Sequence, residues 1–538
     1  MTAPLTLDAD VLVLGGGPAG TWAALGAAAT GARVVLADKG WCGTSGAAAA
    51  GGNNLWYLPP TGPARDRAVG HREAAGGHLT DRRWMFRVLD ETWQRVADLA
   101  DWGYPFPVDD TGVQRRGSLQ GPEYLRLMRR RVRRAGVRIL DHCPALELVT
   151  DGAGQVVGAA GRSRHDGWRE WRTSAGAVVL ATGGCAFLSG ALGLNVDTGD
   201  GHLMAAEVGA RLSGMEFSAA YALAPAFGAQ TKGLMMQFAT YLDEDDREID
   251  VGDPLAGRDV LARHVLAGRR ISARLDRAPA QLRAAARLAQ PNYFLPLDKA
   301  GIDPFTTAYP IRFVLEGTVR GTGGLHLVDD DCATGVPGLY AAGDAATREF
   351  VTGAVSGGGS HNAAWAIASG SWAGAAAGRH ARRRRPSGRG LPAGRAGLRP
   401  TGAATARHPA DIVRAVQEQV MPLDRNYFRT AEGLQDALSV LDGLWYEAST
   451  HLAGAGRDAL TARQAAAMVA HARWMYRAAL ARPESRGLHR RDDRPGREPW
   501  WSRRLLVHGL DEVRLTVLPP SPSAAPARPG LSLSGGQR

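Results

Sequence analysis

The sequence predicts an α/β fold in three parts: a glycine-rich domain built from two separate stretches, a mixed α+β segment between them, and a helical region near the end. A buried strand runs into a glycine-rich turn at residues 15–20, and a similar strand–turn–helix pattern returns at residues 326–378. Residues 190–325 mix helical patterns with an acidic turn. Residues 411–480 carry apolar side chains at helical spacing, which indicates a small helical domain.

The first strand and turn have the pattern of a Rossmann-like βαβ unit. Residues 11–14 are an apolar strand, and Gly15, Gly17 and Gly20 then match G-x-G-x-x-G. In this pattern the first glycine permits the tight turn, the second leaves room for a pyrophosphate, and the third lets helix and strand pack closely. The helix that follows offers free N–H groups to the phosphates. Asp38, at the end of a second strand, is positioned to accept a hydrogen bond from a ribose. This combination predicts dinucleotide binding.

The elements between these landmarks follow from apolar spacing and turn residues. Residues 39–60 are rich in glycine and alanine and form a loop that lets backbone approach a flat or anionic group. Residues 80–102 form an amphipathic helix, with Thr80 and Asp81 placed to cap its start and Gly103 to end it. Further strands are predicted at residues 137–140, 146–149 and 177–180, and further helices at residues 122–134 and 363–377.

These elements predict a chain divided into six segments. We expect the first part of the nucleotide-binding domain, an inserted domain that serves the substrate, the second part of the nucleotide-binding domain, a flexible Arg/Gly/Pro-rich linker, a helical domain, and a tail whose end is disordered. The expected boundaries are, in the same order, residues 1–190, 191–325, 326–380, 381–410, 411–505 and 506–538.

Charge and cysteine content narrow the classes of partner. The formal net charge is +11, but much of the excess arginine alternates with alanine and glycine, as in compositional bias. We therefore expect an anionic substrate or an acidic protein surface, and no nucleic acid. The four cysteines lie far apart with no C-x-x-C, which argues against a metal site or iron–sulfur cluster in this chain. No transmembrane segment or targeting signal is recognisable, so we expect a cytoplasmic protein.

Several further motifs, in order along the chain, resemble the flavoprotein subunits of succinate dehydrogenase, fumarate reductase, L-aspartate oxidase and adenylylsulfate reductase. The resemblance extends over about residues 8–500. It rests on A-T-G-G at 181–184, T-G-D-G at 198–201, M-E-F at 215–217, L-A-x-R-D-V at 255–260, G-L-Y-A-A-G-D at 338–344 and E-S-R-G-x-H at 484–489. It implies FAD as cofactor, a capping domain inserted into the FAD-binding domain, and a C-terminal helical domain.

The resemblance also implies which residues hold FAD. Respiratory members bind FAD covalently through a histidine, and the matching position here is Ser45, so we expect FAD to be bound non-covalently. The expected FAD-binding residues are Gly15, Gly16, Gly17, Gly20, Asp38, Lys39, Thr44, Ser45, Gly46, Gly51, Gly52, Ala145, Ala181, Thr182, Gly183, Asp200, Asp344 and Ser360.

The expected catalytic residues depart from the family pattern. The arginine of the R-D-V motif is present as Arg258, which the resemblance assigns to proton transfer; a salt bridge to a nearby carboxylate is the structural alternative. Tyr221 and Arg320 fall where the family has histidines that bind dicarboxylates, and Val355 falls where it has an arginine. The expected catalytic residues are thus Arg258, Arg320 and Tyr221. Other candidates, which fit a supporting role equally well, are Lys232, His326, Arg348 and His361.

The resulting prediction is an FAD-dependent oxidoreductase that transfers hydride between flavin N5 and a small anionic substrate other than a standard C4 dicarboxylate. An adenylylsulfate-reductase-like subunit acting with a separate ferredoxin-like iron–sulfur protein is the main alternative. The Asn53-Asn54 pair and the run at residues 356–360 resemble motifs of that enzyme. A non-catalytic FAD-bound scaffold is the third reading.

Overall fold

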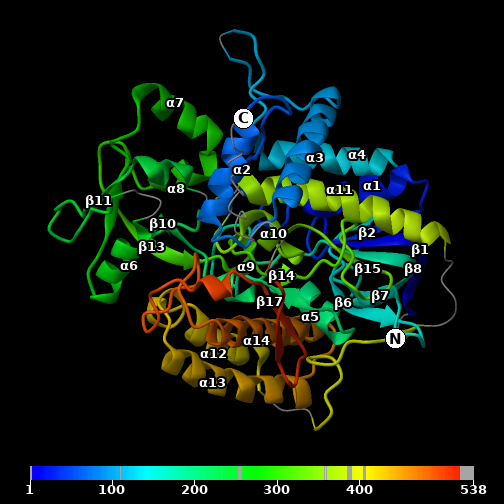
Figure 1. Ribbon diagram of the computed structural model, residues 1–538. Coiled ribbons are helices and arrows are strands. Elements are labelled where there is room, and N and C mark those ends of the chain that lie inside the picture. The colour runs from blue at the N-terminus through cyan, green and yellow to red at the C-terminus, as the bar shows by residue number, and fades with distance from the viewer. Residues whose placement is uncertain are drawn as a thin grey trace, which may run out of the picture.

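The computed structural model describes residues 3–520 apart from residues 110, 232, 253–256, 357, 359, 384–389 and 404–406. Its centre is a sheet in the order β16-β6-β7-β8-β1-β2-β5, with β15 paired to β8 (Figure 1). These strands are β1 (Leu5–Leu14), β2 (Val34–Ala37), β5 (Arg138–Leu140), β6 (Ala145–Thr150), β7 (Val156–Ser163), β8 (Arg169–Leu180), β15 (Leu339–Ala341) and β16 (Leu391–Pro392). Among the described residues, no helix is both long enough and apolar enough to cross a membrane.

The middle of this sheet is parallel. β1 runs parallel to β2 and to β8, and its last four residues are almost fully buried because sheet and helices surround them. On the edge of β8 away from β1, two strands pair with different parts of β8. Residues 169–174 pair with β7, and residues 178–180 pair with β15. The two stretches of the nucleotide-binding domain, separated by more than 150 residues of sequence, therefore meet in one sheet.

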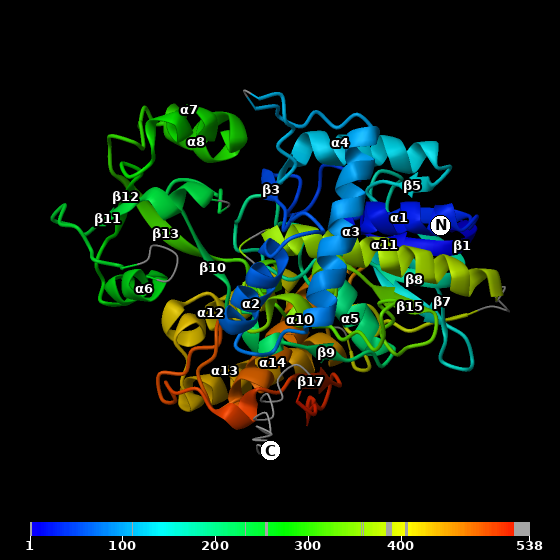
Figure 2. The ribbon, with the colours of Figure 1, turned by 45° about the horizontal axis from the view of Figure 1, so that its top comes forward.

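Helices cover one face of the sheet (Figures 1 and 2). α1 and α11 lie against each other at close range because their contact is made of small residues: a Cβ added to Gly374 would lie 2.0 Å from the Ala23 carbonyl oxygen. The covering helices are α1 (Pro18–Ala29), α2 (Ala64–Ala75), α3 (Arg82–Asp101), α4 (Gly121–Arg134) and α11 (Ser360–Arg383), with the ribbon β3 (Gly52–Asn54) and β4 (Ser118–Gln120) beside them. Asp81 caps α3 by accepting hydrogen bonds from the Arg83 and Trp84 N–H groups.

A second lobe stands to one side and has its own sheet and core (Figure 2). Its antiparallel sheet has the order β10-β13-β12-β11, and its core includes Tyr241, Tyr293 and Phe294. Its elements are β10 (Tyr221–Pro225), η2 (Leu234–Phe238), β11 (Thr240–Leu242), α6 (Arg258–Leu266), β12 (Ser272–Arg274), α7 (Ala280–Ala289), α8 (Pro291–Lys299) and β13 (Tyr309–Leu315).

The C-terminal helices pack beneath the main sheet, where α14 contacts α5, η1 and β17. They are α12 (Pro409–Val420), η4 (Leu423–Tyr427), α13 (Ala431–Thr450), α14 (Arg457–Ala481) and η5 (Pro499–Trp501). The elements they adjoin are α5 (Asp200–Glu207), η1 (Met215–Phe217), α9 (Gly317–Arg320), η3 (Gly343–Ala345) and α10 (Glu349–Thr352), and a sheet of β9 (Leu212–Ser213), β14 (Gly324–Leu325), β17 (Leu505–His508) and β18 (Arg514–Val517).

The α/β fold class predicted from the sequence is confirmed, while two segments differ locally from expectation. Within the stretch expected to be a flexible linker, β16 pairs with β6 and Arg399 forms an ion pair with Glu147, so these described residues are tied to the sheet. At the boundary between the expected helical domain and the expected tail, residues 505–517 contribute two strands. The predicted disordered end lies outside the described residues from residue 521 onward.

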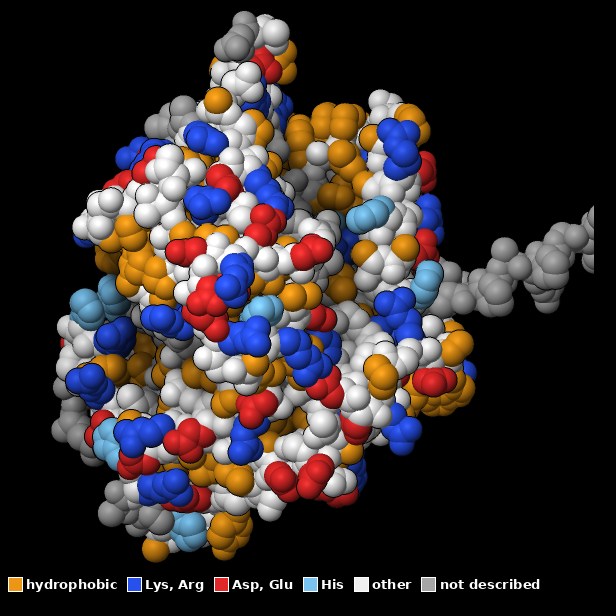
Figure 3. Space-filling view, turned by 90° about the vertical axis from the view of Figure 1, so that its left-hand side faces the viewer, with side chains coloured by type: hydrophobic (Ala, Val, Ile, Leu, Met, Phe, Trp, Pro, Cys, Tyr) orange, Lys and Arg blue, Asp and Glu red, His pale blue; other side chains and the backbone are white. Residues whose placement is uncertain are grey.

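Many of the surface arginine side chains lie next to acidic side chains. On the face shown in Figure 3, Lys and Arg side chains alternate with Asp and Glu, as expected for charges that pair locally. Arg129, for example, lies on the basic helix α4 and forms an ion pair with Asp141 at 2.7 Å.

Candidate functional site

A cavity of about 700 Å³ runs from the glycine-rich turn after β1 to the second lobe. The ends of β1, β2 and β8 and the start of α11 form one end of it, and β10 and α6 form the other. The carboxyl ends of parallel strands are where open α/β sheets bind ligands, because the helix N-termini and loops converge there.

The three glycines of the turn have different structural roles. Gly15 has φ +107°, and a Cβ there would lie 2.2 Å from the Ala181 carbonyl oxygen. A Cβ on Gly20 would lie 1.8 Å from the Gly15 carbonyl oxygen, so this glycine permits the helix to pack on the strand. Gly17 lines the cavity, and a Cβ on it would meet no protein atom within 4 Å. The space beside Gly17 is thus open to a ligand.

Asp38 organises the loop next to this turn. Its carboxylate is 4% exposed and accepts hydrogen bonds from the backbone N–H groups of Gly16 and Gly40 and from the Ser45 hydroxyl. Ser45 thus lies beside Asp38 at the cavity wall, 2.8 Å from its Oδ1. Because a carboxylate oxygen has two lone pairs, these contacts still leave acceptor capacity for a ribose.

Lys39 connects the end of β2 with the T-G-D-G loop. Its Nζ lies 2.6 Å from Asp200 Oδ2 and 2.7 Å from Thr198 Oγ1. Both Lys39 and Asp200 line the cavity and are paired with each other in this structure. The pair holds two segments that are far apart in sequence at the same wall.

Most of the expected FAD-binding residues line this cavity, and three do not. Gly20 lies behind the turn, Thr44 is exposed with its hydroxyl 3.4 Å from the Trp41 carbonyl oxygen, and the buried Gly51 accepts a hydrogen bond from the Gly121 N–H. The expected residues that line it are Gly15, Gly16, Gly17, Asp38, Lys39, Ser45, Gly46, Gly52, Ala145, Ala181, Thr182, Gly183, Asp200, Asp344 and Ser360.

The cavity wall fits FAD in two further respects. Thr182 Oγ1 and Asp197 Oδ2 are buried there and have no hydrogen-bond partner among the described residues. Buried polar atoms are rarely left without partners, so these two indicate a polar ligand. Together with the open space at Gly17, they match a cofactor with phosphate and hydroxyl groups.

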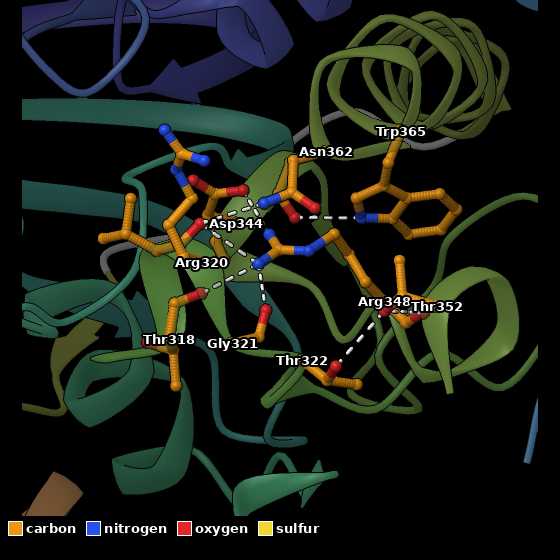
Figure 4. A network of polar contacts seen from close by, with 12 residues as sticks. Thr318, Arg320, Gly321, Thr322, Asp344, Arg348, Thr352, Asn362 and Trp365 are labelled. Atoms are coloured by element: carbon orange, nitrogen blue, oxygen red, sulfur yellow. Dashed lines mark hydrogen bonds and ion pairs between the residues drawn. The ribbon is translucent and has the colours of Figure 1, made fainter. Parts of the chain in front are cut away.

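Asp344 lies in the second stretch of the nucleotide-binding domain and lines the cavity. Arg348 forms an ion pair with it on the side away from the cavity (Figure 4). Arg348 is 1% exposed, forms an ion pair with Asp344, and donates to the carbonyl oxygens of Thr318, Val319 and Gly321. Figure 4 shows the guanidinium inside this set of acceptors. Arg348 is therefore a buried support and does not line the cavity.

Arg258 begins α6 and enters the far end of the cavity from the second lobe. Its Nη1 donates to the Tyr221 carbonyl oxygen at 3.2 Å, and its buried Nε has no hydrogen-bond partner among the described residues. Among the described residues no carboxylate lies within ion-pair distance of it. The neighbouring Asp259 is instead 3.0 Å from Arg490 and 2.6 Å from the Tyr427 hydroxyl. Residues 255 and 256 of the same motif lie outside the described residues.

Arg320 and Tyr221 also line this end, but in different ways. Arg320 Nε lies 3.8 Å from Glu316, whose Oε1 accepts a hydrogen bond from Thr231. The Tyr221 hydroxyl points out of the cavity and lies 3.0 Å and 2.9 Å from the carbonyl oxygens of Val420 and Met421. Burial raises the pKa of this hydroxyl well above its ordinary value. The expected catalytic role of Tyr221 therefore does not agree with the direction of its hydroxyl, and the part of Tyr221 that contacts Arg258 is its backbone carbonyl.

The remaining candidates separate by position. His361 lines the cavity and packs against Trp56 in a tilted arrangement, with 4.5 Å between ring centroids. His326 does not line it and packs near Phe350, where burial lowers its pKa to about 4. Lys232 lies outside the described residues. Val355 lines the cavity, as the family's missing arginine would.

Arg72 is a lining residue that the sequence patterns did not indicate. It lies on α2, is 8% exposed, and donates to the carbonyl oxygens of Thr352, Val355 and Ser356. Burial lowers the pKa of its guanidinium to about 10, and no carboxylate pairs with it among the described residues. An arginine at this place braces the loop that carries Val355 and adds positive charge to the cavity wall.

Comparison with known proteins agrees with this geometry. Residues 10–361 match the FAD binding domain family, and residues 414–524 match the fumarate reductase flavoprotein C-terminal family. L-Aspartate oxidase of Streptomyces coelicolor is 28% identical over 94% of this chain and 92% of its own length. Quinol fumarate reductase of E. coli superposes with a TM-score of 0.78 at 20% identity, covering 97% of this chain and 100% of that one. Adenosine-5-phosphosulfate reductase in complex with sulfite superposes with a TM-score of 0.78 at 18% sequence identity, covering 98% of each chain.

Proposed function

The chain belongs to the family of FAD-binding flavoproteins that includes L-aspartate oxidase and fumarate reductase, and we propose that it transfers hydride between FAD and a small organic anion other than a standard C4 dicarboxylate. Members of this family are FAD-dependent oxidoreductases, and the cavity described above fits their cofactor. When bound, FAD supplies the two-electron chemistry, and the chain binds and orients the substrate.

The observation that carries the proposal is the arrangement of charge at the far end of the cavity. Arg258, Arg320 and Arg72 line it, and Arg258 and Arg72 have backbone carbonyls as their partners there. Guanidinium groups that lack a carboxylate partner favour an anionic ligand. Val355 stands where a second carboxylate of a dicarboxylate would need a cation, and an unpaired buried carboxylate is strongly disfavoured.

Arg258 is the residue that we propose for proton transfer at the substrate, because it lines the far end of the cavity. A guanidinium group carries a positive charge at neutral pH, so Arg258 would stabilise negative charge that develops on the substrate. The Tyr221 carbonyl holds the guanidinium in place by accepting from Nη1. Arg258 Nε, which is buried and has no hydrogen-bond partner among the described residues, would be available to donate to a ligand.

Binding titrations test the substrate class. Adding ligand to the holoprotein shifts the visible absorbance of the flavin, so a dissociation constant can be read for each of a panel of monocarboxylates and for succinate, fumarate and L-aspartate. We expect monocarboxylates to bind more tightly than the three dicarboxylates. The substitution Val355→Arg should lower the dissociation constant for succinate by about tenfold or more, because it restores a cation for the second carboxylate. Val355→Leu is the matched control and should leave it unchanged. Micromolar binding of succinate to the unaltered protein would contradict the proposal.

We also propose that FAD is held without a covalent bond. A serine hydroxyl that already donates to Asp38 stands where respiratory members of the family carry the histidine that bonds to the flavin. Precipitating the protein with acid should leave all of the yellow colour in the supernatant. Flavin that stays in the precipitate through washing in denaturant would show a covalent bond.

A second candidate function is an electron-transferring flavoprotein subunit that acts with a separate iron–sulfur protein. The fold is shared with adenosine-5-phosphosulfate reductase, and no group of three or more His, Cys, Asp or Glu side chains able to hold a metal ion occurs among the described residues. Slow reoxidation of the reduced flavin by O₂ and fast reoxidation by a reconstituted ferredoxin would favour this candidate. Fast reoxidation by O₂ alone would favour an oxidase.

A further inference from the structure

Asp197 is a cavity residue to which neither the sequence motifs nor the mechanism above assigns a role. It directly precedes the T-G-D-G loop, is 4% exposed, and lines the same cavity as the glycine-rich turn. Its Oδ1 lies 2.2 Å from the position that a Cβ on Gly183 would take, so the carboxyl group is packed against the backbone of residue 183. Its Oδ2 is buried and has no hydrogen-bond partner among the described residues.

The charged groups around Asp197 are already paired with one another. Lys39 pairs with Asp200 and donates to Thr198. Arg348 pairs with Asp344, and Asp38 accepts from two backbone N–H groups and a serine hydroxyl. Asp197 therefore has no ion pair of its own with any described residue, and it lies near three other carboxylates.

This environment disfavours a negative charge on Asp197. Burial raises its pKa well above the ordinary value, and the charges of Asp344, Asp200 and Asp38 raise it further, while Lys39 opposes them. A carboxyl group held neutral in this way carries a proton that it can donate in a hydrogen bond. FAD brings a negatively charged diphosphate and several hydroxyl oxygens, all of which accept hydrogen bonds.

We propose that Asp197 binds FAD as a neutral carboxylic acid, donating a hydrogen bond through its unpartnered Oδ2 side to an oxygen of the cofactor. An ionised Asp197 would repel the diphosphate and would have no proton to donate. Gly183 makes room for the Asp197 carboxyl group, because a side chain at residue 183 would occupy the same space. The proposal rests on FAD binding alone and is independent of the substrate proposed above.

The consequence is an FAD affinity that depends on pH. Below the pKa of Asp197 the dissociation constant for FAD is constant, and above it the constant rises by up to tenfold for each pH unit, because the proton must be taken up before FAD binds. The Asp197→Asn variant keeps a donor of the same shape at every pH, so its FAD affinity should lose this dependence. Asp197→Ala removes the donor and should weaken binding about tenfold or more at low pH.

The experiment is the titration of apoprotein with FAD, followed by quenching of flavin fluorescence between pH 6 and pH 10. The unaltered protein, the two Asp197 variants and Asp245→Asn are compared. Asp245 lies on an exposed turn of the second lobe and pairs with Arg247, so its variant should follow the unaltered protein. Circular dichroism of each apoprotein checks that it is folded. A pH dependence that persists unchanged in Asp197→Asn would overturn the proposal even if the alanine variant fails to fold.

Discussion

The two ends of the cavity treat charge in opposite ways. At the end formed by the glycine-rich turn, Asp38, Lys39 and Asp200 are paired with each other or with the backbone. At the end formed by β10, α6 and the loop after α10, Arg258 and Arg72 have backbone carbonyls as partners. Arg320 at this end lies 3.8 Å from Glu316. Among the described residues, Arg258 and Arg72 have no carboxylate partner, so their charge remains available for an anionic ligand, whereas the paired charges at the other end neutralise one another. The difference agrees with the proposal of a cofactor site at the first end and an anionic substrate at the second.

The largest expected effect comes from removing the guanidinium group of Arg258, at the end of the cavity formed by β10 and α6. Replacing Arg258 with Ala should slow hydride transfer between the flavin and the best substrate of the titration panel, in whichever direction that substrate reacts, about 10³-fold, the range lost with a proton-transfer group. FAD should remain bound with unchanged affinity, because Arg258 lies at the other end of the cavity. Stopped-flow absorbance measures both. Arg258→Lys, which keeps the charge but not the fork of donors, is the companion variant, and near-normal rates in both would contradict the assignment.

A pair of glycine variants sharpens the comparison at the cofactor end. Gly15→Ala combines a positive φ with contact to the Ala181 carbonyl and should lower the free energy of unfolding by about 3 kcal/mol. Gly17→Ala meets no protein atom, so the apoprotein should keep its stability to within about 0.5 kcal/mol while its dissociation constant for FAD rises about tenfold or more. Urea unfolding and FAD titration separate the two effects. A Gly17→Ala protein with normal FAD affinity would show that FAD does not approach this turn.

The smallest expected effect concerns Glu349, a buried residue of α10, the helix that leads into the loop lining the far end of the cavity. Glu349 on α10 is fully buried, and burial raises its pKa to about 7, with Glu216 adding to the shift and Arg504 and Arg482 opposing it. Since the folded state retains a proton that the unfolded state releases, the free energy of unfolding should fall as pH rises from about 4.5 to about 7, by on the order of 1–3 kcal/mol.

Glu349→Gln should flatten this part of the stability profile, measured by urea unfolding at pH 5 and pH 7.5. The exposed Glu512, which pairs with Arg514, provides the control variant Glu512→Gln, and its profile should match that of the unaltered protein. A slope that is the same in Glu349→Gln would show that another group causes it.

The cofactor end could be predicted from the sequence because its signals are local. Gly15, Gly20 and Asp38 lie within one βαβ unit, so their spacing can be read from a short stretch of sequence, although the close contact of Gly15 is with the distant Ala181 carbonyl. Arg72 could not be predicted in the same way. Its helix has a single large apolar residue on its buried side, Val69, so no apolar stripe indicates α2, and its partners at residues 352–356 are far away in the sequence.

Tyr221 shows a second limit of sequence reasoning. Its position beside the cavity agrees with the resemblance, but the direction of its hydroxyl is set by the end of α12, about 200 residues later, where Val420 and Met421 offer carbonyl oxygens. Asp197 shows a third limit. A polar residue before a glycine-rich loop is unremarkable in sequence, and only the three-dimensional arrangement leaves its carboxyl group without a cation.

The pairing of β15 with β8 has a consequence for how the protein is made. During synthesis β8 emerges long before β15, so the edge that β15 later covers stays open while more than 150 further residues are added. An unpaired strand edge of this kind invites pairing with other chains. The nascent protein should accordingly depend on chaperones until residue 341 has left the ribosome, and chains truncated before that point should aggregate.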